Sequence, residues 1–297
     1  MLIMFSCGER YSLCCCIILA ENIKLNIERL SVSFMKMSVV MPAYNEEKRI
    51  GKTLEKYSEF FENIRLAGKK HFEYEILIVI NGTTDRTGEI VEGYKKKNPR
   101  IGFLDLVKGG KGYAIIEGFR NALTRENDLI GFVDVDMATS PEEYWKLVLN
   151  INKHDCVIAD RYIKGSRVYP PNTFRRLIVS RVFNVFIRGL LFLPYRDTQC
   201  GAKVFKREVI ERVLPKLKFS KWAFDVDLVY NVRKLGYKIK SFPTVWIDKE
   251  YSKINFWKAG PWMALGVIRL RLINSPLRDL AKFYDFVFNR IKRGRRR

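Results

Sequence analysis

Acidic residues are scarce in the second half of this 297-residue chain. Residues 151–297 contain 33 Lys and Arg but only 11 Asp and Glu, whereas residues 1–150 contain 21 of each, so the net charge of +22 lies in the second half. A neutral half followed by a basic half predicts a catalytic part and a part that meets a polyanion. Nucleic acid and an anionic membrane surface both fit that description.

Several common signatures are also absent. The chain has neither G-x-G-x-x-G nor G-x-x-x-x-G-K-[ST], which argues against dinucleotide-binding and P-loop proteins. Its six cysteines form no C-x-x-C pair, and four of them lie within the first sixteen residues, a pattern that fits neither a zinc site nor a disulfide scaffold. We therefore expect the bulk of the protein to be reduced and cytosolic.

No hydrophobic run is long enough to predict a membrane span. The apolar stretch at residues 13–20 is too short to cross a bilayer. A credible strand begins only at Met37, so we interpret residues 1–36 as a leader that is poorly ordered or not translated, with Met35 or Met37 as the functional start. The alternative is a genuine anchor.

From Met37 to about residue 160, strand-like apolar runs alternate with segments of helical periodicity. Strands are expected at residues 38–41, 74–80, 101–106, 129–133 and 156–159. This order predicts an α/β fold, Rossmann-like, with a mostly parallel sheet and helices on both faces. The loops that follow the strands then meet at one edge of the sheet, where ligands bind.

The most informative motif follows the strand at 129–133. Asp134 and Asp136 alternate along the chain, so their carboxylates point the same way at the end of that strand. Two adjacent carboxylates repel each other unless a cation lies between them, and a hard divalent ion that also binds phosphate suits this place. Mg²⁺ or Mn²⁺ is the expected cofactor, although an isolated D-x-D is usually a turn or a helix cap.

Three further loops on the same edge have chemistry suited to a nucleotide. Pro42, Tyr44 and Glu46 offer an aromatic ring and polar groups for a base. Asn81 ends the second strand and can bond a base edge. Lys111 lies in a glycine-rich loop before a helix, where a cation and free N–H groups bind phosphate.

Taken together, these motifs resemble those of the inverting GT-A glycosyltransferases of family 2. The resemblance rests on Ser38–Glu47, the turn through Asp85, Lys111-Gly112 and Asp134-Val135-Asp136. Residues 197–205 and 222–228 narrow it to the dolichyl-phosphate β-glucosyltransferase branch, with the dolichyl-phosphate mannosyltransferases close by.

The resemblance implies a nucleotide-sugar donor, a divalent metal and a polyprenyl or dolichyl phosphate acceptor. Pro42, Tyr44, Glu46 and Asn81 would line the nucleoside, and Asp134 and Asp136 would hold metal and diphosphate. Family members often have Asp-Asp-Gly-Ser where this chain has Ile80-Asn81-Gly82-Thr83, which leaves UDP and GDP both open as the nucleotide.

Inverting transfer is a single displacement, so charge on the leaving diphosphate must be stabilised. Lys111 and a metal at Asp136 serve that need. Asp225 precedes an apolar-periodic helix, and either caps that helix or orients or deprotonates the acceptor. Asp227 is the weaker candidate. Six basic residues are expected to hold the acceptor phosphate: Arg161, Arg175, Arg181, Arg188, Arg196 and Lys203.

The domain organisation follows from these assignments. Residues 37–250 form the glycosyltransferase domain, with a nucleotide-sugar half at about 37–160 and an acceptor half at about 161–250. Residues 174–193 and 251–297 predict amphipathic helices that lie on a membrane, followed by a polybasic tail that attracts anionic lipid. The alternative is core helices with a solvated tail.

The favoured hypothesis is a peripheral enzyme at the cytoplasmic face of a membrane that moves a hexose, glucose from UDP-glucose before others, to a polyprenyl phosphate. A mannosyltransferase that uses GDP-mannose, or a family 2 enzyme with another acceptor, is the nearest alternative. A basic nucleic-acid-binding protein is the non-enzyme alternative, but no RRM, KH or zinc module is recognisable, so we expect no nucleic acid as partner.

Overall fold

The structure is a computed structural model of the whole chain. It describes residues 34–67, 71–170, 174–218, 223–247, 256–276 and 278–280, with the backbone alone at 174–178, 256–259. Most of the leader expected at 1–36, and the end of the chain from residue 281, lie outside the described residues.

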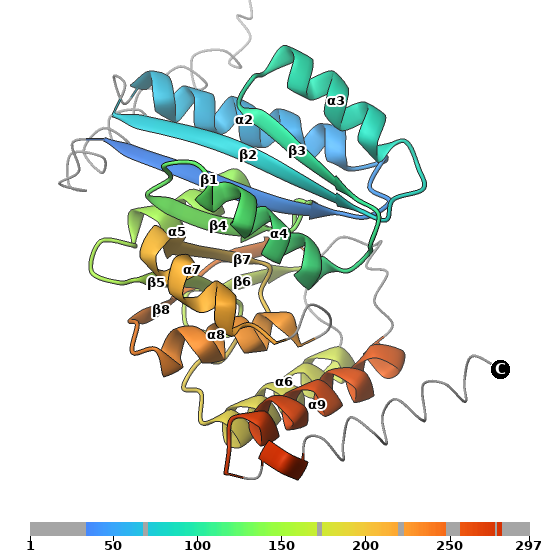
Figure 1. Cartoon of the computed structure of the whole chain (residues 1–297), viewed down its shortest axis with the longest axis vertical. Helices are drawn as coiled ribbons and strands as arrows, with labels where there is room; N and C mark the ends of the chain where they lie inside the picture. The colour runs from blue at the N-terminus through green and yellow to red at the C-terminus, as the bar shows by residue number, and fades with distance from the viewer. Residues whose placement is uncertain are drawn as a thin grey trace, which may run out of the picture.

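The first half alternates strands and helices as the sequence predicts (Figure 1). Its elements are β1 (Met35–Ala43), α2 (Ile50–Ala67), β2 (Phe72–Asn81), α3 (Thr87–Lys97), β3 (Ile101–Leu106), α4 (Lys111–Leu123), β4 (Leu129–Val133), α5 (Pro141–Leu149) and β5 (Cys156–Asp160). The first strand starts at Met35, two residues inside the stretch interpreted as a leader.

The second half is less regular. Its elements are β6 (Arg167–Tyr169), α6 (Phe174–Leu191), β7 (Ala202–Lys206), α7 (Arg207–Val213), the short 3₁₀ helix η1 (Leu214–Lys216), α8 (Phe224–Lys234), β8 (Ile239–Pro243), β9 (Val245–Ile247) and α9 (Phe256–Ile273). The sequence pattern predicts none of the four strands in this half.

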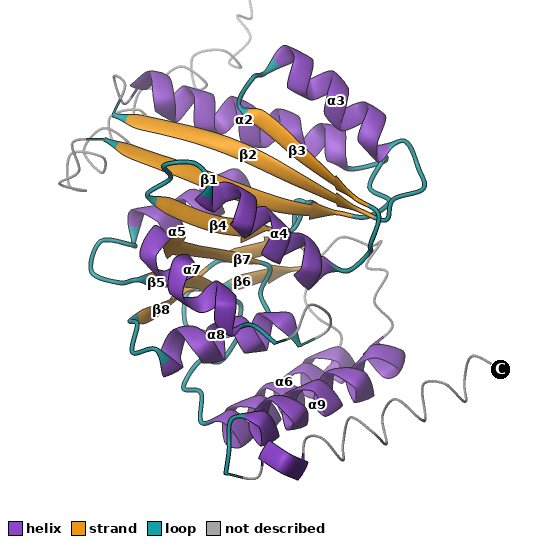
Figure 2. Ribbon diagram, viewed as in Figure 1, coloured by secondary structure: helices purple, strands orange, loops and turns teal. Residues whose placement is uncertain are grey.

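Seven strands form the main sheet in the order β3-β2-β1-β4-β7-β5-β8 (Figure 2). Every pairing is parallel except those of β7, which runs antiparallel between β4 and β5. The expected mostly parallel α/β sheet is therefore confirmed, with one reversed strand at its centre. The strands β6 and β9 pair separately in a small parallel sheet.

Helices cover both faces of the sheet, and each face has its own apolar core. On one face α2 and α5 pack through residues such as Tyr57, Phe61 and Trp145. On the other, α4, α7 and α8 pack through residues such as Phe119, Phe205 and Phe224. The strand β4, between the two cores, is apolar and buried along its whole length, as a doubly covered sheet requires.

The helices α6 and α9 lie side by side below this sandwich, next to α8 (Figures 1 and 2). Ile187 and Leu191 of α6 meet Val267 and Leu270 of α9 and Val226 of α8 in a small apolar cluster. Within the described residues, none of the helices has both the length and the apolar character needed to cross a membrane.

Gly118 gives a test of how tightly α4 packs on the sheet. A Cβ at this position would lie 2.4 Å from Cγ1 of Val40 and 3.0 Å from Cγ2 of Val79, whereas a Cβ at Gly93 of α3 would meet nothing within 4 Å. We expect Gly118→Ala to destabilise the fold by about 1–3 kcal/mol through overpacking. The matched control Gly93→Ala should stabilise it by about 0.5–1 kcal/mol. Thermal melting followed by circular dichroism measures both, and equal shifts in the two variants would contradict the packing described here.

Candidate active site

The D-x-D motif lies directly after β4, at the edge of the sheet where the parallel strands end. Asp134 donates its backbone N–H to the carbonyl of Gly201 at 2.9 Å. Gly201 immediately precedes β7 and approaches Asp134 so closely that a Cβ on it would lie 1.9 Å from Oδ2 of that carboxylate. Only glycine fits here, so the reversed strand sets the position of the first carboxylate.

Two hydrogen bonds hold the segment that follows Asp134. Thr53 of α2 donates its hydroxyl to the carbonyl of Val135 at 2.7 Å, and Oδ1 of Asp136 accepts the N–H of Ala138 at 2.9 Å. Met137 has a left-handed backbone, with φ of 60°. A turn of this kind is costly for a residue other than glycine and is held in place by these contacts.

Lys111 begins α4 and reaches Asp134. Its Nζ lies 2.6 Å from Oδ1 of that residue. Burial lowers the pKa of Lys111, but the carboxylates of Asp134 and Asp225 outweigh that effect and hold the pKa above its ordinary value. Lys111 is therefore a fixed positive charge beside the D-x-D motif, and the phosphate contact expected of it stays a prediction.

The loops after β1, β2 and β3 are joined by Asn81. This buried side chain donates to the carbonyl of Ala43 at 2.8 Å and accepts the N–H of Gly110 at 2.9 Å. Asn81 thus ties the end of β1 to the glycine-rich loop that carries Lys111. The base contact expected of Asn81 stays a prediction, and holding these loops is a further role that the sequence did not indicate.

The first loop presents the remaining nucleoside candidates. Tyr44 is 50% exposed, so its ring is accessible for stacking. Glu46 accepts two hydrogen bonds from Arg49, at 2.6 and 2.7 Å, and its backbone N–H binds the hydroxyl of Thr87. Pro42 is the next-to-last residue of β1 and is partly buried. All three lie at the edge that carries Asp134.

Lys203 is buried inside the sheet and not at the acceptor-binding surface that the sequence analysis predicted. It was expected to bind the acceptor phosphate, but its exposed fraction is 0% and its ammonium donates to the carbonyl of Cys200 and to Oδ1 of Asp225, both at 2.7 Å. The prediction is wrong because β7 runs through the middle of the sheet. Its side chains are buried on both faces, and Lys203 can bind only protein groups.

Asp225 occupies the second position of α8 and does not cap it. Ala223 is the residue at the cap, so the capping alternative is excluded. The Asp225 side chain is 15% exposed and lies close enough to Lys111 to raise the pKa of that residue. Asp227, the weaker candidate, is fully buried and accepts hydrogen bonds from the N–H of Lys218 and the amide of Asn231, so it has a structural role.

Arg161 follows β5 and forms a bidentate pair with Asp197. Its Nε and Nη2 lie 2.6 and 3.0 Å from the two carboxylate oxygens, and its guanidinium stacks over the ring of Trp246. Burial raises the pKa of Asp197, but the guanidinium of Arg161 outweighs it and leaves that pKa below its ordinary value. Arg161 is thus partly neutralised, which weakens it as a phosphate ligand.

The other predicted phosphate ligands lie farther along the chain. Arg181 of α6 stacks over Tyr162 at 4.6 Å from the ring centroid, which brings it beside Arg161 on the same ring. Arg188 and Arg196 are exposed. Arg175 lies in the first turn of α6, and its side chain is outside the described residues.

The two carboxylates suit a divalent cation. Burial, and then the neighbouring charge of Asp134, raise the pKa of Asp136, so a cation beside the two carboxylates would favour their charged form. Carboxylate oxygens are the ligands that Mg²⁺ and Mn²⁺ prefer. No larger group of His, Cys, Asp and Glu that could hold a metal occurs among the described residues. The site therefore fits an ion that shares its remaining positions with phosphate and water.

Three important residues were not predicted as site residues. Gly201 and Asp197 belong to the segment that carries the resemblance, but the sequence gives no sign that they contact Asp134 and Arg161. The ring of Phe132 in β4 lies 4.9 Å from Nζ of Lys203 and 5.9 Å from Nζ of Lys111. Only the pairing of β4 with β7 brings these groups together.

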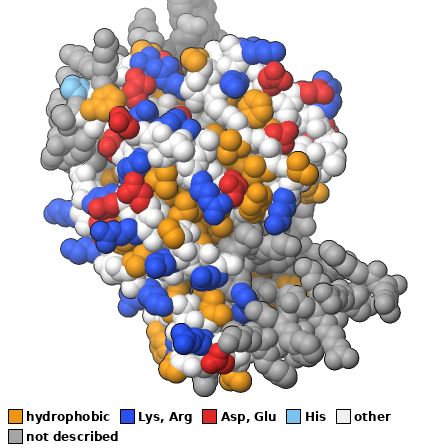
Figure 3. Space-filling model, in the orientation of Figure 1, with side chains coloured by type: hydrophobic (Ala, Val, Ile, Leu, Met, Phe, Trp, Pro, Cys, Tyr) orange, Lys and Arg blue, Asp and Glu red, His pale blue; other side chains and the backbone are white. Residues whose placement is uncertain are grey.

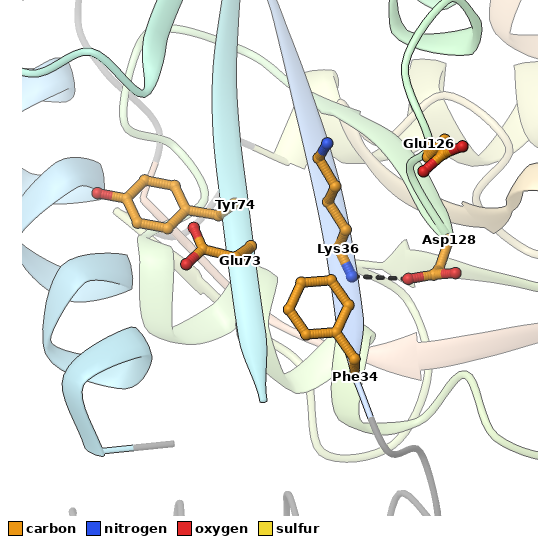
Figure 4. Close-up of a pocket in the computed structure, with 6 residues that line it drawn as sticks. All are labelled: Phe34, Lys36, Glu73, Tyr74, Glu126 and Asp128. Carbon is orange, nitrogen blue, oxygen red and sulfur yellow. Dashed lines mark hydrogen bonds between the residues drawn. The ribbon is translucent and has the colours of Figure 1, made fainter. Parts of the chain in front are cut away.

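A separate cavity of about 430 Å³ lies at the opposite end of the strands. Figure 4 shows its lining, where the backbone N–H of Lys36 donates to Asp128 at 2.7 Å, at the beginning of β1 and just before β4. Because Asp134 follows the far end of β4, this cavity is distinct from the candidate site.

Comparisons with solved structures agree with the fold. Glucosyl-3-phosphoglycerate synthase from Mycobacterium tuberculosis, solved with Mn²⁺, UDP and glucosyl-3-phosphoglycerate, superimposes with a TM-score of 0.56 at 16% identity, over 85% of this chain and 82% of that one. The same enzyme solved with Mn²⁺, UDP-glucose and phosphoglyceric acid also gives a TM-score of 0.56. At this identity the likeness shows the fold alone.

Proteins found by sequence comparison have a higher sequence identity to this chain than these solved structures have. Dolichyl-phosphate β-glucosyltransferase from Drosophila melanogaster is 32% identical over 78% of this chain and 72% of its own length. The enzyme of the same name from Homo sapiens is 30% identical over 82% of this chain and 78% of its own.

The profile of Glycosyl transferase family 2 matches residues 38–214, a range that contains the D-x-D motif, Lys111 and Gly201. The chain therefore belongs to glycosyl transferase family 2, whose members are nucleotide-sugar-dependent enzymes.

Proposed function

We propose that the protein transfers a hexose, glucose from UDP-glucose before others, to a polyprenyl or dolichyl phosphate with inversion at the anomeric carbon. The observation that carries this proposal is the meeting of Asp134, Asp136, Lys111 and Asp225 at one edge of the sheet. The names of the relatives supply the acceptor class.

The donor would lie along the loops after β1 to β4. Tyr44 stacks on the base, with Pro42, Glu46 and Asn81 beside it, and the diphosphate reaches Lys111. Asp134 and Asp136 would hold a divalent ion, Mg²⁺ or Mn²⁺, which when bound would supply positive charge against the charge of the diphosphate. Lys111 already binds Asp134, so its ammonium is in place to stabilise the departing diphosphate.

The reaction is one displacement. A phosphate oxygen of the acceptor forms a bond to the anomeric carbon while the bond from that carbon to the diphosphate oxygen breaks and the diphosphate keeps the electron pair. A phosphate monoester has a second pKa of about 6, so part of the acceptor carries one remaining proton near neutral pH. The Asp225 carboxylate accepts that proton and orients the attacking oxygen.

The acceptor would approach from the side of α6. Arg181 and Arg161 share the ring of Tyr162, and Arg188 and Arg196 are exposed beyond them. These cations, with Arg175, provide the charge that an anionic acceptor needs. In the lower part of Figure 3, where α6, α8 and α9 lie, the described surface carries many Lys and Arg side chains and few acidic ones.

The same region would lie on an anionic membrane as interfacial helices. Val182 and Val185 of α6 are 63% and 64% exposed, and Phe192 beyond the helix is 70% exposed. Val185, Arg188 and Phe192 line a hollow of about 510 Å³. Exposed apolar side chains interleaved with arginines are typical of a helix at the lipid interface. The polybasic tail at residues 290–297 would add to this attraction, on the cytoplasmic face of the membrane.

A transfer assay tests the reaction. Purified protein with polyprenyl phosphate, Mg²⁺ or Mn²⁺ and a panel of UDP- and GDP-sugars is expected to yield lipid-linked sugar, most rapidly from UDP-glucose. Because Asp136 would hold the metal, Asp136→Asn should lower the rate about 100-fold or more. Chromatography of radiolabelled lipid product measures the rate.

The matched control is Asp128→Asn, which removes a carboxylate at the other end of β4, where Asp128 binds the backbone of Lys36. This variant should keep its transfer rate. Transfer that persists in excess EDTA would contradict the metal role, and product from GDP-mannose alone would replace glucose by mannose in the proposal.

Gly201→Ala tests whether β7 fixes the first carboxylate. The added methyl group would occupy the place of Oδ2 of Asp134, so that carboxylate must move away from Lys111. Displacement by about 1 Å is expected to cost roughly 100-fold in transfer rate. Gly93→Ala, in open space on α3, is the control and should keep its rate. An active Gly201→Ala enzyme would show that the position of Asp134 is not critical.

Flotation on liposomes tests the membrane contact. Val182→Asp and Val185→Asp should each weaken binding to anionic vesicles by about tenfold, because each places a charge where an apolar side chain meets lipid. Leu66→Asp on α2 is the control, since Leu66 is equally exposed at 63% and α2 lies at the opposite end of the molecule from α6 (Figure 1). Equal loss in all three variants would contradict a specific role of α6.

A further inference from the structure

Lys203 is a buried charge inside the main sheet. Its side chain has no exposed surface, and its ammonium is bound by the carbonyl of Cys200 and by Oδ1 of Asp225. Burial of an ion pair costs several kcal/mol of desolvation, and apolar residues of similar size often stabilise a fold as well or better. Stability alone therefore gives little reason for a lysine at this position.

The location of this ion pair relates it to the reaction. Lys203 lies opposite Phe132 in the register of β7 with β4, two residues before Asp134. The centroid of the Phe132 ring lies 4.9 Å from the Lys203 ammonium and 5.9 Å from that of Lys111, and Phe224 packs on this ring in a T-shaped arrangement. Asp225 directly follows Phe224, so the same packing places its carboxylate near Lys111.

We infer that Lys203 is a positioning residue for the transfer reaction: its ammonium holds Oδ1 of Asp225 and turns the other carboxylate oxygen toward the acceptor. Lys203 itself touches neither donor nor acceptor, because it is buried beneath Asp225. The inference rests on the proposed function for the role of Asp225. It also explains how Asp225 keeps a fixed orientation although it does not cap its helix.

Packing alone does not account for these contacts. A residue that only filled space would make no directed bond to a partly exposed carboxylate, whereas Lys203 makes one at 2.7 Å. Lys206, in the same strand, provides the comparison. It is 34% exposed and pairs at 3.3 Å with Asp155, before β5 and away from the site.

Four variants test the inference: Lys203→Met, Asp225→Asn, the double variant, and Lys206→Met as the matched control. If Lys203 acts through Asp225, Lys203→Met should lower kcat by about 10- to 100-fold and leave KM for the nucleotide sugar nearly unchanged. The double variant should then be no slower than Asp225→Asn, because the two residues act as a unit. Lys206→Met should keep the wild-type kcat.

Two results would overturn the inference. One is an unchanged kcat in Lys203→Met. The other is additivity: the double variant has a lower kcat than Asp225→Asn, by the same factor by which Lys203→Met lowers the wild-type kcat. Melting curves and UDP binding by calorimetry report folding separately. Should Lys203→Met fail to fold, the double variant, which leaves no buried charge unpaired, still gives the comparison with Asp225→Asn.

The same assay separates this inference from the proposed function. A wild-type enzyme that forms no lipid-linked sugar would refute the proposed acceptor alone. The variants are then compared on transfer to water, in which water replaces the acceptor, loses its proton to Asp225 and releases free sugar and nucleoside diphosphate. The inference is supported in this hydrolysis assay too if Lys203→Met lowers the rate of the wild-type enzyme but does not lower the rate of Asp225→Asn any further.

Discussion

The antiparallel pairing of β7 between β4 and β5 is the interaction on which the site depends. The first residues of this strand and the glycine before it meet the D-x-D motif, so Gly201 fixes Asp134 and Lys203 binds Asp225. A parallel strand at this position would leave different side chains at this edge. The reversed direction brings residues about 70 positions apart in the chain into one array of charges.

Two ion pairs have their cations beside one aromatic ring. Lys111 pairs with Asp134 and Lys203 with Asp225, and both ammonium groups lie within 6 Å of the Phe132 ring centroid. Asp134 and Asp225 thus each have a cationic partner before a ligand arrives, and each attraction offsets part of the desolvation cost. Burial and the charge of Asp134 raise the pKa of Asp136, so a divalent cation beside these two carboxylates would favour their charged form.

The basic half of the chain divides into two kinds of residue. Lys203 and Arg161 face protein carboxylates and organise the interior, whereas Arg188 and Arg196 face solvent. The net charge of +22 therefore overstates what is available to an acceptor. Exposed valines beside the arginines of α6 favour lipid over nucleic acid as the partner of this surface.

The sequence by itself determined the regular part of this protein. Alternating apolar runs and helical periodicity predicted five strands of the first half within a few residues, because doubly covered parallel strands carry a continuous apolar signal. The motifs after those strands could be placed at one edge from the order of the elements alone. Tertiary structure decided the rest. The strand β7 has a lysine at its second position and another at its last, which hid it from hydrophobic patterning, and Asp225, the partner of Lys203, lies 22 residues away. Whether a lysine binds a substrate or a buried carboxylate depends on which strands are neighbours, and no local pattern contains that information.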